Sequence, residues 1–349
     1  MSLPRKLFTL AAATTAAALT VQAINRRRRW WDLRGKSIIV TGGSRGLGLD
    51  LARQLADRGA KIAIFARDAD EMKRALGDVR TRGTAIAVQC DVTDREDVDR
   101  AVAIVRQSFG RVDAIINDAG VIGVGPHEAM TEADYDRAMR THFYGPLHLI
   151  LAVLPEMEQR RDGRIVNISS IGGKIAVPHL VPYTASKFAL TGLSEALRTE
   201  LAACNVFVTT VIPGLMRTGS PRNADFKGQP DAEYAWFMTS DNTPGLSVNP
   251  ADIAERILDA MQAGDAELIH QFSAAAATKL HALFPKLSAE LAAVVERLLP
   301  HGHLKTRVKG RDVSGAVRVP RFARNSDETA ARTHNETLPV SYPTQPGDV

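Results

Sequence analysis

Cysteine is scarce in this sequence of 349 residues, which contains only Cys90 and Cys204. Two cysteines so far apart exclude a disulfide framework and a cysteine-based metal site, and they fit a reducing compartment. The histidines are scattered without the spacing that metal ligands show. We therefore predict no metal site. The sequence also lacks an internal repeat.

Acidic residues are nearly absent from residues 1–36, where Asp32 stands against eight Lys and Arg. The whole chain has a formal net charge of only +5, so this basic excess is local. A local excess favours an electrostatic contact at one end and argues against a nucleic-acid-binding body. We expect no nucleic-acid partner.

Long hydrophobic runs are absent except at residues 7–24, which carry no charge. As a helix, this run would span about 27 Å, close to the thickness of a bilayer core. Four arginines and Trp30-Trp31 follow it, as expected on the cytoplasmic side of a membrane. We predict a membrane anchor with the rest of the chain facing the cytoplasm. A free cytoplasmic tail and a signal peptide cleaved near Val21-Gln22-Ala23 are the alternatives.

Short apolar runs alternate with longer amphipathic stretches between residues 36 and 270, which is typical of βαβ units. The predicted strands are residues 37–40, 61–65, 85–89, 112–116, 164–168, 206–211 and 267–269. Helices are predicted to begin near Gly46, Asp70, Asp94, Thr131, Tyr183 and Pro250. We expect an α/β fold with a doubly wound, Rossmann-type parallel sheet of about seven strands. Its ligand site would lie at the carboxyl ends of the strands.

A glycine-rich stretch follows the first predicted strand: Thr41-Gly42-Gly43-Ser44-Arg45-Gly46-Leu47-Gly48. In this fold such a stretch binds a dinucleotide, with the pyrophosphate at the helix N-terminus. Its spacing, G-x-x-x-G-x-G, differs from the commoner G-x-G-x-x-G. At the end of the second strand, Arg67 takes the position that binds the extra phosphate of NADP, and Arg45 can reach the same phosphate. We predict NADP. NAD is the alternative, because a one-residue shift would place Asp68 at the acidic position that NAD requires.

Polar and small residues also follow the later strands. Asp91-Val92 would contact the adenine amine or cap the next helix. The small residues of Asn117-Asp118-Ala119-Gly120 let the backbone approach the cofactor. Pro213-Gly214 forms a turn able to hold the nicotinamide end, with the Thr218 hydroxyl as an amide or phosphate contact.

Tyr183 and Lys187 are four residues apart, so a helix places them on one face. A free phenol titrates near pH ~10, and a neighbouring ammonium lowers that pKa because it favours the phenolate. Tyr183 could then exchange a proton with a carbonyl or an alcohol near neutrality. Ser170 precedes Tyr183 by thirteen residues, and its hydroxyl could donate to the substrate oxygen.

Together these segments resemble the short-chain dehydrogenase/reductase family. The matching motifs are Thr41-Gly42-x-x-x-Gly46-x-Gly48, Asn117-Asp118-Ala119-Gly120, Ser170, Tyr183-x-x-x-Lys187 and Pro213-Gly214. The resemblance implies that Tyr183 is the general acid/base, Ser170 orients the carbonyl or hydroxyl, and Lys187 binds the nicotinamide ribose while lowering the pKa of the phenol. It also implies hydride transfer to or from a nicotinamide ring, usually in a homodimer or homotetramer.

Two positions depart from the family pattern. The family usually has asparagine where this chain has Asp118, and its catalytic asparagine stands where this chain has His142. That asparagine supports a water that links the lysine to solvent, and a histidine can preserve such a relay. His142 is therefore either a catalytic residue that titrates near neutrality or a structural residue that closes the helix kink.

The last third of the chain is harder to interpret. Residues 221–243 occupy the place of the family's substrate lid, and their aromatic residues either enclose an apolar substrate or pack the lid onto the body. Residues 287–299 carry an apolar helical stripe that would pack on the domain or contact a membrane or subunit. Residues 301–349 are polar and aperiodic, so we expect mostly disorder.

The sequence thus predicts an anchor at residues 1–35, a catalytic domain at 36–270, a helical extension at 271–300 and a tail. We expect an NADP-preferring oxidoreductase that interconverts a carbonyl and a secondary alcohol on a lipophilic small molecule such as a ketosteroid, a long-chain ketone or a ketoacyl group. A cofactor-binding scaffold without turnover is one alternative, because of Asp118 and His142. A nucleotide-sugar epimerase is the other, although the tail does not resemble the substrate domain of that branch.

Overall fold

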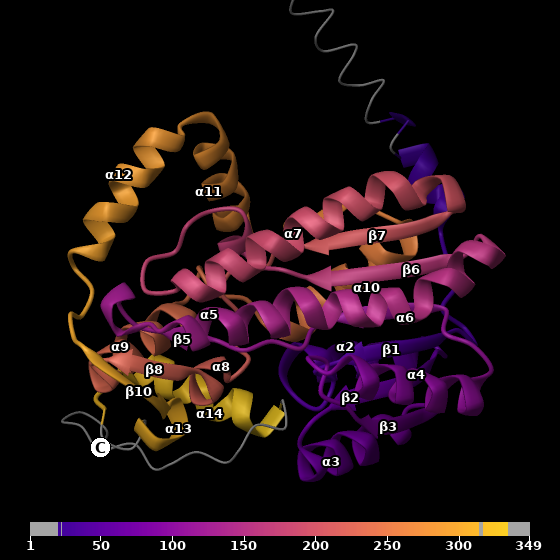
Figure 1. Cartoon of the computed structure of the whole chain (residues 1–349), viewed down its shortest axis with the longest axis horizontal. Coiled ribbons are helices and arrows are strands. Elements are labelled where there is room, and N and C mark those ends of the chain that lie inside the picture. The colour runs from indigo at the N-terminus through magenta and orange to yellow at the C-terminus, as the bar shows by residue number, and fades with distance from the viewer. Residues whose placement is uncertain (1–19, 22, 314–316, 334–349) are drawn as a thin grey trace, which may run out of the picture.

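The computed structural model describes residues 20–21, 23–313 and 317–333 (Figure 1). At its centre lies a seven-stranded sheet of order β3-β2-β1-β4-β6-β7-β9, in which all neighbouring strands are parallel. The strands are β1 (Ser37–Thr41), β2 (Lys61–Ala66), β3 (Ala85–Gln89), β4 (Ala114–Asn117), β6 (Gly163–Ile168), β7 (Val206–Val211) and β9 (Glu267–Leu268). The predicted doubly wound parallel sheet is confirmed, with strand ends shifted by one or two residues.

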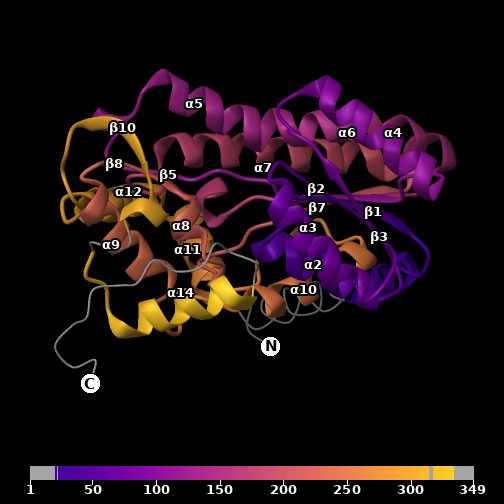
Figure 2. The same cartoon turned by 90° about the horizontal axis from the view of Figure 1, so that it is seen from below.

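Helices cover both faces of this sheet, as Figure 2 shows. One face carries α2 (Gly46–Asp57), α3 (Ala69–Arg80) and α10 (Pro250–Ala263), and the other carries α4 (Arg95–Phe109), α6 (Gly145–Arg160) and α7 (Val181–Leu201). Alternate residues of β1 enter different cores: Ile38 and Val40 pack with α2 and α10, whereas Ile39 packs with α4 and α6. This two-sided burial explains why the strands read as continuous apolar runs.

A second, three-stranded sheet of order β10-β8-β5 lies beside the main one. It joins β5 (Gly123–Val124), β8 (Asp225–Gly228) and β10 (Leu304–Lys309), and β10 is antiparallel to β8. Around it lie α5 (Glu132–Met139), α8 (Ser220–Asn223), α9 (Pro230–Asp241), α13 (Gly310–Val313) and α14 (Arg321–Thr333). The predicted lid residues 221–243 therefore form part of a folded layer.

The aromatic residues of that layer are mostly core residues. Phe226, Tyr234, Phe237 and Met238 are buried together with Val313, Val317, Val319 and Ala323 from the C-terminal part of the chain. Of the two roles that the sequence left open for the lid, these three aromatic side chains and Met238 take the packing role.

The expectation of disorder after residue 300 is wrong for the described part of this segment. Residues 304–309 form β10, and 321–333 form α14. This segment is polar, and in the fold its charged residues pair with residues far away in the chain. Arg307 pairs with Asp134, Lys309 with Asp225 and Asp327 with Arg222. Such non-local ion pairs leave no periodic pattern in the sequence.

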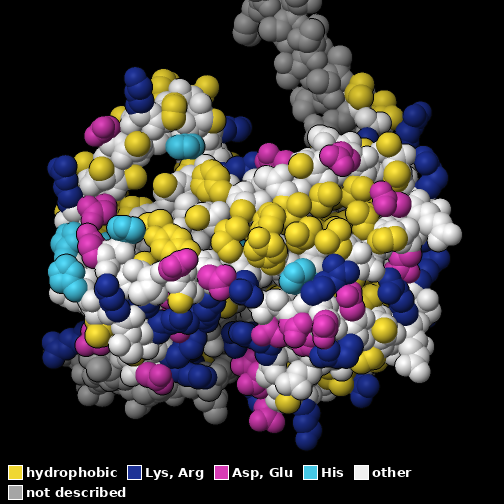
Figure 3. Space-filling view, viewed as in Figure 1, with side chains coloured by type: hydrophobic (Ala, Val, Ile, Leu, Met, Phe, Trp, Pro, Cys, Tyr) yellow, Lys and Arg dark blue, Asp and Glu magenta, His cyan; other side chains and the backbone are white. Residues whose placement is uncertain are grey.

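The helical stripe after residue 286 does not pack on the domain, which corrects the first of its two predicted roles. It forms α12 (Pro285–Glu296), in which no residue is buried, and α12 makes a hairpin with α11 (Phe272–Leu283). The hairpin leaves the body as an arch in Figure 1, and Figure 3 shows hydrophobic side chains on it. Phe272 is 89% exposed and Leu283 is 73% exposed.

The N-terminal basic segment is held against the body where the structure describes it. Arg26 pairs with Asp265 at 3.0 Å, and the indole of Trp31 donates to Asp162 at 2.9 Å. Within the described residues, no helix combines the length and apolar character needed to cross a membrane. The predicted anchor at residues 7–24 falls almost entirely outside the described residues.

The buried pair Arg222–Asp327 gives a direct test of the C-terminal packing. Its side chains are 4% and 0% exposed. Asp327→Ala removes the carboxylate of this pair but leaves the Arg222 charge buried. We therefore expect the free energy of unfolding to fall by about 3–5 kcal/mol. Urea denaturation measures this loss, with Asp99→Ala as the control. Asp99 belongs to an exposed ion pair with Arg95, for which the expected loss is about 0.5 kcal/mol. Equal losses in the two variants would contradict the packing.

Candidate active site

A row of buried hydrogen bonds joins the carboxyl ends of β1, β4 and β6. The Thr41 hydroxyl accepts the N–H groups of Asp118 and Ala119, both at 3.1 Å. The Asn117 amide donates to Asn167 at 2.8 Å, and the Asn167 amide donates to Ser194 of α7 at 2.7 Å. Thr41 and Asn117, both predicted as cofactor contacts, thus hold the strand ends and α7 in fixed positions relative to one another.

The glycine-rich stretch forms a cradle where β1 meets α2. Gly42 has a φ of +71°, and a Cβ at Gly48 would lie only 2.4 Å from the Gly42 carbonyl oxygen. Helix α2 has no side-chain cap and no acidic residue in its first turn. Apart from the Gly48 N–H, which bonds to Asp118, its first N–H groups therefore suit a phosphate ligand, and the residues present fit a dinucleotide. Leu47, which belongs to the stretch predicted to bind the cofactor, is instead buried in the hydrophobic core.

Charged residues surround the end of β2. Strand β2 ends at Ala66, one residue later than predicted, and Asp68 accepts the Glu71 N–H at 2.8 Å as the N-cap of α3. Arg45 donates to Glu71 at 2.9 Å, and Ser44 donates to the same carboxylate at 3.2 Å. Glu71 therefore holds the Arg45 side chain in place. Glu71 was not predicted from the sequence because no motif marks it.

Arg67 is more exposed than Arg45 and has a looser partner. Its guanidinium lies 3.9 Å from Asp91, and its side chain is 64% exposed. Asp91 accepts the N–H and hydroxyl of Thr93, while α4 is capped by Asp94. The alternative that Asp91 caps the next helix is therefore wrong. The carbonyl of Val92 lies 3.1 Å from Nδ1 of His148.

Ser170, Tyr183 and Lys187 come together at the end of β6. Tyr183 and Lys187 are one turn apart on α7, and the Lys187 Nζ lies 5.6 Å from the centre of the Tyr183 ring. Lys187 is buried and donates to the Ile168 carbonyl at 2.8 Å. Ser170 hydrogen-bonds to the phenol, and its hydroxyl accepts the Gly172 N–H at 3.1 Å. One helix and one strand end thus bring the three predicted groups together.

Burial is the largest influence on the pKa values of Tyr183 and Lys187. It raises the pKa of Tyr183 to about 12, against a hydrogen bond from Ser170 that lowers it. It also lowers the pKa of Lys187 to about 8, although Asp118 acts in the opposite direction. The expected lowering of the phenol pKa is therefore wrong for this structure, because desolvation of the phenolate, with the charges of Asp241 and Asp118, outweighs the hydrogen bond from Ser170.

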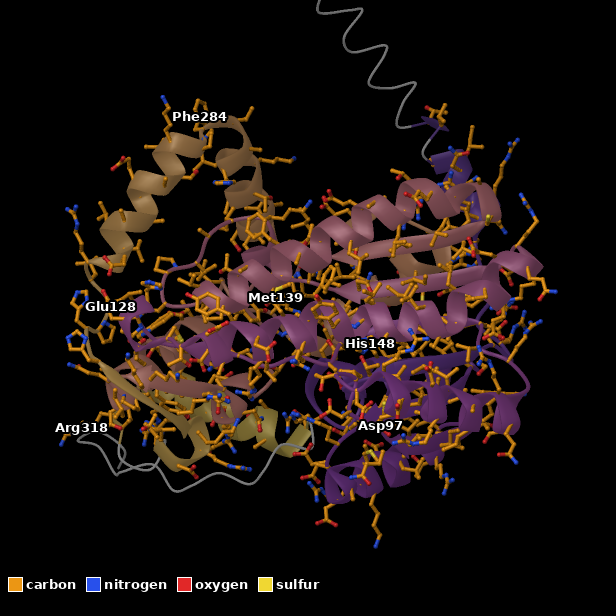
Figure 4. The ribbon with its side chains drawn as sticks, viewed as in Figure 1. Asp97, Glu128, Met139, His148, Phe284 and Arg318 are labelled. Carbon is orange, nitrogen blue, oxygen red and sulfur yellow. The ribbon has the colours of Figure 1, made fainter. Side chains whose placement is uncertain are left out.

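His142 lies in a π-helical turn (Arg140–Tyr144) between α5 and α6. Figure 4 labels Met139, which precedes this turn, and His148, which follows it in α6. The His142 Nε2 accepts the Val121 N–H at 3.1 Å. Its Nδ1 lies 2.7 Å from the Ser186 hydroxyl, which donates to the Tyr183 carbonyl at 2.8 Å. Because Nε2 accepts, Nδ1 carries the proton and donates to Ser186.

These bonds leave His142 no free nitrogen for a water relay. Its ring contacts the Tyr183 ring edge-on, with the centroids 5.3 Å apart. Burial, followed by the charges of Lys187 and Arg137, holds the pKa of His142 well below its ordinary value. The expectation that His142 titrates near neutrality is therefore wrong, and the residue supports the position of Tyr183.

Two buried carboxyl groups with raised pKa values act electrostatically on Tyr183. Burial raises the pKa of Asp118 to about 7, although Lys187 and a hydrogen bond from the Gly48 N–H lower it. Burial also raises the pKa of Asp241 on α9 to about 7, against a hydrogen bond from the Met216 backbone. Both carboxylates contribute to the high pKa of Tyr183. No motif in the sequence marks Asp241, which acts on Tyr183 only because of the fold.

The turn after β7 is held by Gln271, which lies 57 residues beyond Gly214 in the chain. The buried Gln271 accepts the Gly214 N–H and donates to the Leu215 carbonyl at 2.7 Å. The Pro213 carbonyl accepts the Ile171 N–H at 2.8 Å, which ties this turn to the Ser170 loop. The Thr218 hydroxyl lies 2.5 Å from that of Ser220. Gln271 was missed because a lone glutamine carries no motif.

Asp118→Asn tests the electrostatics of the site. Because the pKa of Asp118 in the folded protein lies above its ordinary value, the folded state holds a proton that the unfolded state loses, and stability falls as pH rises towards 7. Asparagine does not titrate, so the variant does not lose this stability as pH rises. We expect the free energy of unfolding of the variant, relative to that of the wild type, to be about 2–3 kcal/mol higher at pH 8 than at pH 5. The measurement is urea denaturation at both pH values, with exposed Asp99→Asn as the control. A pH-independent difference would contradict the raised pKa.

Comparison with known proteins gives a consistent answer. The family model of the short chain dehydrogenases matches residues 36–227. Dehydrogenase/reductase SDR family member 7B of Danio rerio is 31% identical over 259 residues, which cover 72% of this chain and 82% of the relative. A putative ketoacyl reductase of Streptomyces coelicolor is 32% identical over 229 residues, covering 63% of this chain and 87% of the relative.

A solved structure agrees with the fold. The crystal structure of a short-chain dehydrogenase from Streptomyces avermitilis matches with a TM-score of 0.66 and 30% sequence identity, over 75% of this chain and 97% of that chain. The chain therefore belongs to the short-chain dehydrogenase/reductase family and is an NAD(P)-dependent oxidoreductase of carbonyl and alcohol groups.

Proposed function

We propose that the protein is an NADP-preferring reductase that converts the carbonyl of a lipophilic substrate into a secondary alcohol, with Tyr183 as the proton donor. The observation that carries this proposal is the meeting of Ser170, Tyr183 and Lys187 beside the glycine cradle at one edge of the sheet. The bound nicotinamide supplies or accepts the hydride. The protein groups bind, orient and transfer the proton.

In this proposal Ser170 donates a hydrogen bond to the substrate oxygen, and the Tyr183 Oη delivers the proton as negative charge develops there. A phenol with a pKa of about 12 stays protonated at neutral pH, which supports the reductive direction. Lys187, held by the Ile168 carbonyl, would bind the nicotinamide ribose. His142 would act as a positioning residue that keeps the phenol ring in place.

The cofactor site would follow the strand ends. We assign the pyrophosphate to the N-terminus of α2, where Gly42, Gly46 and Gly48 leave room, and the 2′-phosphate to Ser44, Arg45 and Arg67. The remaining predicted contacts are Asp91 and Val92 for adenine, Asn117, Ala119 and Gly120 along the nucleotide, and Pro213, Gly214 and Thr218 at the nicotinamide.

A lipophilic substrate is supported by the pocket that Tyr183 helps to line, because Val121, Met130, Ala138 and Pro182 supply apolar walls. The Streptomyces coelicolor relative is named a putative ketoacyl reductase, which favours a ketoacyl chain among the substrates considered.

We also propose that the protein forms homo-oligomers. Figure 3 shows a band of hydrophobic side chains over α6 and α7. On these two helices, Leu151 is 48% exposed and Phe188 is 43% exposed. A second copy of the chain would remove this apolar surface from water.

Attachment to the cytoplasmic face of a membrane remains a proposal that rests on residues 7–24 and the arginines after them, and the exposed apolar hairpin of α11 and α12 supports it. Removal of residues 1–24 keeps the contacts of Arg26 and Trp31 with the body. We expect this truncation to move the protein from the membrane fraction to the soluble fraction, with an unchanged midpoint of thermal unfolding. An unchanged membrane fraction would contradict the N-terminal anchor.

Tyr183→Phe tests the proposed proton donor. The ring keeps its contact with His142, but the group that transfers the proton is lost. We expect NADPH affinity within about twofold of the wild type and a fall in carbonyl reduction of at least about 100-fold, the lower range for general acid catalysis. NADPH absorbance over a panel of ketones and ketoacyl esters measures turnover. Tyr144→Phe, on a tyrosine that is 46% exposed, is the control. Full turnover in Tyr183→Phe would refute the assignment.

Arg67→Ala tests the cofactor preference. Loss of one charge-assisted contact to the 2′-phosphate should raise the KM for NADPH by about tenfold or more, and NADH, which lacks that phosphate, should be affected little. Lys73→Ala removes an exposed cation from α3 and serves as the control. Equal changes for the two cofactors would show that Arg67 does not bind the 2′-phosphate.

A further inference from the structure

The C-terminal strand β10 brings cations to the wall of the pocket that Tyr183 helps to line. Arg307, on β10, lies in this wall with Lys227 of β8 and Arg137 of α5. Asp134 and Asp225 line the same pocket. The charged wall is thus built from three elements that are far apart in the chain and meet at the small β10-β8-β5 sheet.

The charges in this wall do not balance. Asp134 pairs with Lys227 and, at 3.2 Å, with Arg307. Asp225 pairs with Arg137 and, at 2.7 Å, with Lys309. The wall thus holds three cations against two carboxylates, a net charge of +1, and Lys309, which does not line the pocket, brings the whole cluster to +2.

Both carboxyl groups stay ionised at neutral pH. Burial alone would raise the pKa of Asp134, but hydrogen bonds from Lys227 and Thr131 outweigh it and hold this pKa below its ordinary value. Burial is likewise outweighed at Asp225, whose pKa is lowered by hydrogen bonds from Lys309 and Arg137. The net charge therefore counts both carboxylates as negative, and the positive excess remains.

Two of the cations keep donors for a ligand. The arginine side chains are 31% exposed at Arg137 and 39% exposed at Arg307, whereas Lys227 is buried. The ion pairs described above engage Nη1 of Arg137 and Nε of Arg307, and a guanidinium carries five N–H donors in a fork that matches planar oxyanions. Apolar Val121, Met130 and Pro182 line the same pocket.

We propose that the carbonyl substrate carries a second, anionic oxygen group, a carboxylate or a phosphate, which binds Arg137 and Arg307 while the carbonyl lies at Tyr183. The substrate class is then an amphiphile with an apolar chain between the two groups. An excess of positive charge beside a partly closed pocket attracts such an anion and rejects neutral analogues. This inference rests on the proposed function for the carbonyl end alone.

Binding to the full-length protein tests the anion site without any turnover. Isothermal titration calorimetry compares octanoate and octyl phosphate with 1-octanol. We expect at least one of the anions to bind about tenfold more tightly than the alcohol, and the tighter of the two identifies the headgroup. Arg307→Gln should weaken that anion by about tenfold, and Arg307→Lys should restore part of the loss.

Lys305→Gln is the matched control, because Lys305 is a cation of the same strand that does not line the pocket. It should bind the anion as the wild type does. The proposal is overturned if the alcohol binds as tightly as both anions, or if Arg307→Gln binds the anion as the wild type does.

Turnover separates this inference from the proposed function. With NADPH, the wild type should reduce 7-oxooctanoate with a kcat/KM about tenfold above that of its methyl ester, and Arg307→Gln should bring this ratio close to one. Equal reduction of acid and ester by the wild type would keep the proposed function and overturn the anion site. Reduction of neither compound, with octanoate binding that depends on Arg307, would overturn the proposed function and keep the anion site.

Discussion

The buried hydrogen bonds at the carboxyl ends of β1, β4 and β6 are the constraint on which the rest of the site depends. Thr41 holds the backbone of Asp118 and Ala119 beside the glycine cradle, and Asn167 ties β4 through β6 to Ser194. Ser194 lies on α7, the helix that also carries Tyr183 and Lys187. The cofactor cradle and the proton donor are therefore set relative to each other by side chains that need not touch any ligand. Unpaired polar groups in this position would be costly, so the row forms as a unit.

Desolvation decides the chemistry of the groups placed by that row. It favours the neutral forms of Tyr183, Lys187 and Asp118 alike, with pKa values of about 12, 8 and 7. A protonated phenol is ready to donate to a carbonyl, which supports the proposed reductive direction. His142 adds rigidity: both of its nitrogens are bonded within the protein, and its ring holds that of Tyr183. The departure from the family asparagine therefore changes the surroundings of the tyrosine and leaves the tyrosine in place.

Local patterns in the sequence predicted the parallel sheet, the glycine cradle and the one-turn spacing of Tyr183 and Lys187, because strand burial, helix starts and helical faces depend on neighbouring residues. Non-local features could not be predicted in this way. The polar segment at residues 304–309 gives no sign that Asp134 and Asp225 await its cations. Glu71, Asp241 and Gln271 reach the site only through the fold. The pairwise argument for an acidic phenol failed because it left out the burial of Tyr183, which sequence spacing does not report.

The central claim is that a hydride passes between a nicotinamide and the substrate carbonyl at this site while the protein supplies the proton. The most direct measurement is reduction of a ketone substrate with NADPH that carries two deuterium atoms at C4 of the nicotinamide, followed by NMR of the alcohol. The account predicts one deuterium on the carbinol carbon of every product molecule, and none on that carbon when ordinary NADPH is used in D₂O. Deuterium on the carbinol carbon from D₂O, or its absence with the labelled cofactor, would contradict the account.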